Sequence, residues 1–152
     1  MTDIEIAKAN LSGHSICLCK DGDIITDDGR GISPMMRFIH EGRDLSGYSA
    51  ADVIVGKAAA MLFVKAGIVE VYGKVMSTAG RDYLIRHDIP CSWDILTERI
   101  INRKDDDICP MEKTVAELED AEQGYLALKC KLQEMRKLRG GQNEIQKESP
   151  HR

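Results

Sequence analysis

The segment from Asp44 to Gly67, DLSGYSAADVIVGKAAAMLFVKAG, constrains the fold more than any other part of the chain. Between Ala50 and Ala66 only four residues interrupt a run of apolar side chains: Asp52, Gly56, Lys57 and Lys65. A helix that is apolar on every side must pack on more than one side. The segment therefore predicts a central buried helix.

Composition limits the classes of protein to which the chain can belong. With 152 residues, 43% of them apolar, the chain can bury one core. Aromatic residues make up 5% and the net charge is −4, whereas nucleic-acid binders rely on aromatic platforms or a basic surface. The chain shows neither a signal segment nor an apolar run of about 18 residues, and its five cysteines are irregularly spaced. We expect a cytoplasmic protein with no nucleic-acid or membrane partner.

The remaining segments alternate between helical and strand patterns. Thr2 and Glu5 have the spacing of a capping box at the start of a helix, and Asp21-Gly22 is a typical hairpin turn. The predicted order around the central helix is a helix after Thr2, strands His14–Lys20 and Asp23–Thr26, a helix capped by Ser33, a strand Ile68–Met76, a helix from Ser77-Thr78 to about His87, and a strand Cys91–Leu96. This order predicts an α/β fold, a three-layer α/β/α sandwich with a mixed sheet of four or five strands.

The C-terminal part is more polar. Within the polar residues 97–112, Arg99 to Arg103 fit either an edge strand or a helical turn. From Met111 a long helix is predicted, with a seam of apolar residues at alternating spacings of three and four: Leu118, Ala121, Tyr125, Leu128, Leu132 and Met135. The helix either packs back on the domain or pairs with a second copy, which would make the protein a homo-oligomer. The expected units are a domain over 1–117, an amphipathic helix over 118–139 and a disordered tail over 140–152.

Candidate ligand-binding residues stand at two predicted helix starts, Ser49 with Asp52 and Ser77 with Thr78. Helix N-termini at the carboxyl ends of strands bind anions. The alternative for Ser49 and Asp52 is a capping box. Lys57 lies in an apolar run, so its ammonium must reach solvent, pair or act on a ligand. Weaker candidates for the same cleft are Asn102, Arg103, Cys109 and Glu112.

Five separated motifs resemble those of the domain-of-unknown-function family DUF1893. They are RGISP at 30–34, DLSGYSAAD with GKAAAML between 44 and 62, VMS at 75–77, INR at 101–103 and CPME at 109–112. The resemblance spans roughly Ile4 to Glu117. It implies a cytidine-deaminase-like fold, an α/β/α sandwich around a mixed sheet, and no known activity.

Zinc-dependent deaminases carry a His or Cys ligand followed by Glu at one helix start, and P-C-x-x-C at the next. The two candidate positions here hold Ser49-Ala50-Ala51-Asp52 and Ser77-Thr78-Ala79-Gly80-Arg81, with no thiolate or imidazole. We therefore expect neither zinc nor another cofactor. A cysteine-nucleophile enzyme based on Cys109 lacks an identifiable His partner in the sequence.

Two functional interpretations remain open. In the first, the chain is a deaminase-like domain without zinc ligands that binds a small anionic or nucleotide-like molecule where helix N-termini converge. In the second, it is an interaction module that oligomerises through the C-terminal seam and an apolar sheet edge, with no ligand.

Overall fold

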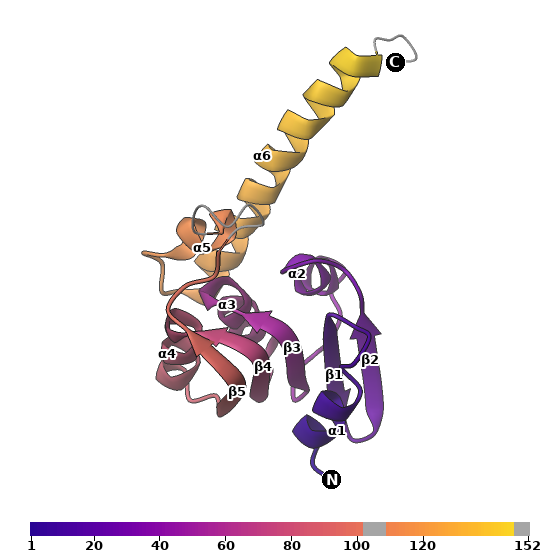
Figure 1. Cartoon of the computed structure of the whole chain (residues 1–152), viewed down its shortest axis with the longest axis vertical. Helices are drawn as coiled ribbons and strands as arrows, with labels where there is room; N and C mark the ends of the chain where they lie inside the picture. Colours follow the sequence, from indigo (N-terminus) through magenta and orange to yellow (C-terminus); the bar gives the residue numbers. More distant parts are fainter. Residues whose placement is uncertain (102–108, 148–152) are drawn as a thin grey trace.

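The computed structural model describes residues 1–101 and 109–147, with side chains of the last helix described as far as Leu138. In this part of the chain, α1 covers one face of a five-stranded sheet and the other helices lie on the opposite side (Figure 1). The elements are α1 (Asp3–Ala9), β1 (Ile16–Lys20), β2 (Asp23–Asp27), α2 (Ser33–His40), β3 (Ser49–Val55), α3 (Lys57–Ala66), β4 (Glu70–Ser77), α4 (Thr78–Arg86), β5 (Cys91–Thr97), α5 (Pro110–Val115) and α6 (Ala121–Lys147).

The sheet is mixed, as predicted. Its strand order is β2-β1-β3-β4-β5. β1 pairs antiparallel with both β2 and β3, whereas β3, β4 and β5 are parallel to one another. Helices α3 and α4 connect the parallel strands, so the carboxyl ends of all three strands meet at one edge of the sheet, facing α5 (Figure 1).

The predicted central helix is wrong in its first half. Residues Ser49–Val55 form strand β3, and the helix α3 begins only at Lys57. β3 lies between β1 and β4 and is covered on both faces. The sequence of such a strand is a continuous apolar run, which cannot be distinguished from that of a buried helix. Gly56 separates the two elements, and its extended backbone is the N-cap of α3. Ser49 and Asp52 therefore do not form a capping box.

Several local predictions are confirmed. Thr2 and Glu5 form the reciprocal capping box of α1, and Ser77 caps α4 by accepting a hydrogen bond from the Gly80 N–H at 3.0 Å. Strands β1 and β2 form the hairpin around Asp21-Gly22. Ser33, however, is the first residue of α2, and Ile32 is the N-cap; the Ser33 hydroxyl donates to the Arg30 carbonyl at 2.8 Å.

Two apolar clusters hold the layers together. The smaller one lies under α1 and contains the buried thiols of Cys17 and Cys19. The larger one lies between the sheet and the helices α2 to α6. Cys130, in contrast, is exposed on α6.

The predicted C-terminal helix is two helices, because the chain leaves helical geometry between α5 and α6. The seam of α6 packs on the domain itself: Leu128 is fully buried and Tyr125 is 7% exposed in the larger cluster. Tyr125 and Leu128 are therefore not free to pair with a second copy, whereas Leu132 and Met135 are only partly buried. The helix continues past Gly140-Gly141 to Lys147, and residues 148–152 of the predicted tail lie outside the described part. In that part, no helix is long and apolar enough to cross a membrane.

Candidate functional site

A cleft of about 360 Å³ lies at the edge of the sheet where the parallel strands end. It is bordered by the first turns of α3 and α4, by the residues after β5 and by α5. Its lining residues are Lys57, Ser77, Ala79, Asp82, Arg86, Glu98, Arg99, Ile100, Glu112 and Ala116. Clefts at this position of open α/β sheets are common ligand sites.

Two glycines allow the N-termini of α3 and α4 to approach each other. A Cβ at Gly80 would lie 2.9 Å from the backbone carbon and oxygen of Gly56. A Cβ at Gly56 would lie 2.6 Å from the carboxyl group of Glu112. A side chain at Gly80 would force the two helix starts apart, whereas one at Gly56 would displace the carboxyl group of Glu112.

The carboxylate of Glu112 occupies the N-terminus of α3. Its two oxygens accept hydrogen bonds from the backbone N–H groups of Lys57 and Ala58, both at 2.9 Å. These are two of the donors that a helix start leaves without an internal partner. Burial raises the pKa of Glu112, against the opposing effect of these two hydrogen bonds and the nearby Lys57 charge. The N-terminus of α3 thus already holds an anionic group, supplied from α5.

Lys57 is only 8% exposed, so its ammonium does not extend into solvent but has partners within the protein. Its ammonium donates to the Ala116 carbonyl at 3.1 Å and lies 6.0 Å from the centre of the Tyr83 ring. Together with the Glu112 carboxylate, this arrangement fastens α5 and the segment after it to the start of α3. Lys57 is therefore a buried, partnered cation beside the cleft.

Helix α4 supplies three of the lining residues at helical spacing, namely Ala79, Asp82 and Arg86. Arg86 donates to both carboxylate oxygens of Glu119, at 3.0 and 2.9 Å. Sequence reasoning missed Asp82, Arg86, Glu98 and Arg99. The spacing of three residues from Ala79 to Asp82 and of four from Asp82 to Arg86 was a usable signal for the two on α4. The two that follow β5 carry no comparable pattern.

The structure divides the predicted site residues. Lys57, Ser77 and Glu112 line the cleft, and Thr78 begins α4 beside it. Cys109 is the N-cap of α5 and packs against the larger core cluster, outside the cleft lining. Asn102 and Arg103 lie outside the described residues.

Ser49 and Asp52 do not belong to this cleft. Ser49 begins β3 opposite Glu70, so about 20 Å of extended strand separates it from the carboxyl end. Asp52 lies in the middle of β3, where burial raises the pKa of its carboxyl group to about 8 even though the backbone N–H groups of Val53 and Ile54 hydrogen-bond it. The expected four-residue site was wrong for these two because they belong to a strand and not to a helix start.

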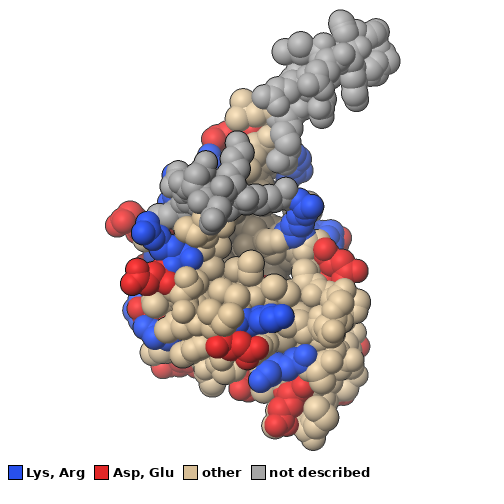
Figure 2. Space-filling view, in the orientation of Figure 1, with Lys and Arg blue, Asp and Glu red and all other residues tan. Residues whose placement is uncertain are grey.

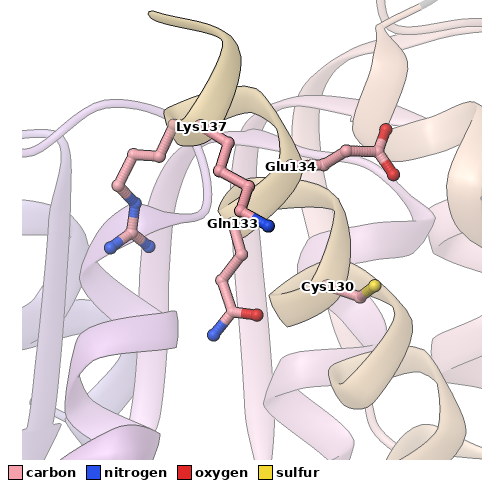
Figure 3. A pocket seen from close by; sticks show the side chains of 5 residues that line it. Cys130, Gln133, Glu134 and Lys137 are labelled. Carbon is pink, nitrogen blue, oxygen red and sulfur yellow. The ribbon is translucent and has the colours of Figure 1, made fainter. Parts of the chain in front are cut away.

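Two further observations bear on ligand chemistry. A hollow of about 650 Å³ lies along α6, and Figure 3 shows Cys130 and Glu134 extending to the same side of that helix. All of its lining residues come from this one helix, so the hollow is an open surface. They are Cys130, Gln133, Glu134, Arg136 and Lys137. Among the described residues, no group of three or more His, Cys, Asp or Glu side chains is arranged to hold a metal ion.

Comparisons with known proteins place the chain among uncharacterised relatives. A family model described as TM1506, domain of unknown function (DUF1893), matches residues 6–132. The crystal structure of a DUF1893 family protein (TM1506) from Thermotoga maritima, at 2.70 Å resolution, is similar with a TM-score of 0.72 and 24% identity over 78% of this chain and 80% of that one. No curated protein matches. At this identity the solved structure supports the fold alone.

Proposed function

The chain belongs to the DUF1893 family, and we propose that it binds a small anionic or nucleotide-like molecule in the cleft at the carboxyl ends of β3, β4 and β5. The observation that carries this proposal is a space of about 360 Å³ beside two helix N-termini, lined by three carboxylates and three cations, of which Arg99 has no ion pair among the described residues. The volume is in the range of small-molecule sites, roughly 300 to 1,000 Å³.

The position of the Glu112 carboxylate at the start of α3 also supports the binding of an anion in this cleft. Two backbone N–H groups of α3 already hold an anionic oxygen pair there, which is the interaction that a ligand carboxylate or phosphate would make. We infer that a ligand places its charged group near Arg99 and the first turn of α4. A guanidinium is well suited to either group because it can donate two parallel hydrogen bonds.

The proposal is for binding and includes no reaction. The described lining residues contain neither a histidine nor a cysteine, and the deaminase-like interpretation of the fold rests on the sequence resemblance. The five free cysteines fit a protein that works in a reducing cytoplasm, which is part of the proposal.

The proposal can be tested by thermal-shift measurements on the full chain with a panel of nucleotides and phosphorylated metabolites at millimolar concentration. We expect at least one compound to raise the melting temperature, and Arg99→Gln to abolish that rise. Arg81→Gln is the matched control, because Arg81 pairs with Asp82 on the same helix as Arg86 but does not line the cleft. Absence of any stabilising compound, or equal loss in both variants, would refute the cleft as the binding site.

A second candidate function is self-association through the sheet edge. In the described part of the sheet, β5 is the outermost strand next to β4, and it exposes Trp93, Ile95 and Leu96 to 36%, 56% and 36%. Exposed apolar edge strands are sites of pairing with another chain. Sedimentation velocity at tens of micromolar tests this candidate, because a dimer that Ile95→Lys converts to monomer would support it and a monomeric wild type would exclude it.

A further inference from the structure

A second hollow, separate from the cleft, lies between α2 and α6. It has a volume of about 360 Å³. One face of α2 supplies Ser33, Met36, Arg37 and His40, and one face of α6 supplies Tyr125, Lys129, Leu132, Gln133 and Arg136. Each set follows helical spacing, so two helices present a continuous face to the same space. We call this hollow the α2–α6 groove.

The groove is lined by positive charge. Arg37, Lys129 and Arg136 come from opposite walls. None of the described lining residues is acidic. Figure 2 shows Lys and Arg side chains where α6 leaves the domain, with Asp and Glu side chains beside them.

Most of these cations lack a carboxylate partner. Arg37 pairs with Asp27, which lies outside the lining. Lys129, Arg136 and His40 form no ion pair within the described part of the chain. The groove differs in this respect from the cleft and from the hollow along α6, each of which has at least one carboxylate in its lining. Like charges that converge without a partner repel one another, and an anion between them relieves that repulsion.

The floor of the groove is apolar and firmly held. Met36 and Tyr125 are 8% and 7% exposed and belong to the larger core cluster, and Leu132 packs against that cluster. α2 and α6 both pack on α3, which fixes the distance between the walls. Cations around the rim and an apolar floor below suit a molecule that carries phosphate groups on an organic body.

From this arrangement we propose that the α2–α6 groove binds an organic phosphate with at least two negative charges, of about the size of a mononucleotide. The phosphates contact Lys129 and Arg136 on one wall and Arg37 on the other, and the organic body covers Met36 and Leu132. This site is independent of the cleft beyond β4, which shares none of its lining residues.

Isothermal titration calorimetry of the full chain with ADP and with inorganic pyrophosphate tests the proposal. We expect both probes to bind and ADP to bind more tightly, because only ADP has an organic body. The Lys129→Gln/Arg136→Gln variant is expected to weaken ADP binding roughly tenfold or more, since each charge-assisted hydrogen bond contributes that much. Lys131→Gln is the control: Lys131 pairs with Glu134 on the same helix and does not line the groove, so its affinity for ADP should stay within about twofold of wild type.

Four results would overturn the proposal. The first is no heat of binding for either probe at millimolar concentration. The second is an equal loss of affinity in the groove variant and in Lys131→Gln, which would indicate diffuse attraction to α6. The third is co-sedimentation with phosphatidylglycerol vesicles without any binding of ADP, which would assign the cations to a lipid surface. Loss of ADP affinity in Arg99→Gln with no change in the groove variant would likewise place the site in the cleft.

Discussion

Asp52 should make the stability of this protein fall as the pH rises. Its carboxyl group is buried in the middle of β3, and burial raises its pKa from 3.8 to about 8. Between these two values the native state keeps the proton and the unfolded state releases it. The free energy of unfolding therefore decreases with increasing pH, by about 1.4 kcal/mol per pH unit. From pH 5 to pH 8 this residue alone accounts for a loss of up to roughly 4 kcal/mol.

Asp52→Asn removes the titration and keeps the shape of the side chain. We expect the stability of the variant relative to wild type to rise steadily between pH 5 and pH 8. Urea unfolding followed by circular dichroism at several pH values measures this difference. Asp88→Asn is the control, because Asp88 is exposed and its left-handed backbone accommodates Asn. A relative stability of Asp52→Asn that stays constant from pH 5 to pH 8 would refute the argument from burial.

Three further predictions concern packing and capping, each measured as a change in the free energy of unfolding. Leu128→Ala should cost about 2 to 5 kcal/mol because Leu128 is fully buried, whereas Leu126→Ala, at a residue 52% exposed on the same helix, should cost under about 0.5; similar costs would contradict the docking of α6. Gly80→Ala should cost about 1 to 3 kcal/mol because its Cβ meets the Gly56 backbone, and a neutral result would show that the two helix starts can separate. Ser77→Ala should cost about 1 kcal/mol through loss of the cap on α4; no cost would show that the cap does not stabilise the helix.

The parts of the fold that the sequence predicted well are those with short-range causes. Thr2 and Glu5 are three residues apart, and the side chain of each accepts a hydrogen bond from the backbone N–H of the other. Ser77 caps α4 by accepting a hydrogen bond from the backbone N–H three positions later. The turn at Asp21-Gly22 uses positive φ angles at both residues, which the dipeptide favours. Each of these patterns involves residues no more than three positions apart in the sequence.

The central element was misread because burial alone does not identify secondary structure. Val53, Ile54 and Val55 are β-branched residues that favour strands, but the Ala-rich run on either side favours a helix. The position of β3 between two other strands decided the outcome, and that position depends on pairing with residues elsewhere in the chain.

The candidate site was only partly predictable for a related reason. Glu112 caps a helix that begins at Lys57, 55 residues earlier, and no spacing rule connects the two. The α2–α6 groove likewise joins faces of two helices that are distant in sequence. Lys57 was recognisable from the sequence, since a charge inside an apolar run is visible without knowledge of the fold.

The most direct test of the cleft is a two-dimensional NMR titration of the labelled full chain with ADP, one of the nucleotides in the thermal-shift panel. If ADP occupies the cleft, the backbone amides of Lys57, Ala79 and Gly80 should shift in a saturable manner. If these amides stay in place at millimolar ADP, or if only residues of α2 and α6 respond, the cleft does not bind this nucleotide and the central proposal is contradicted.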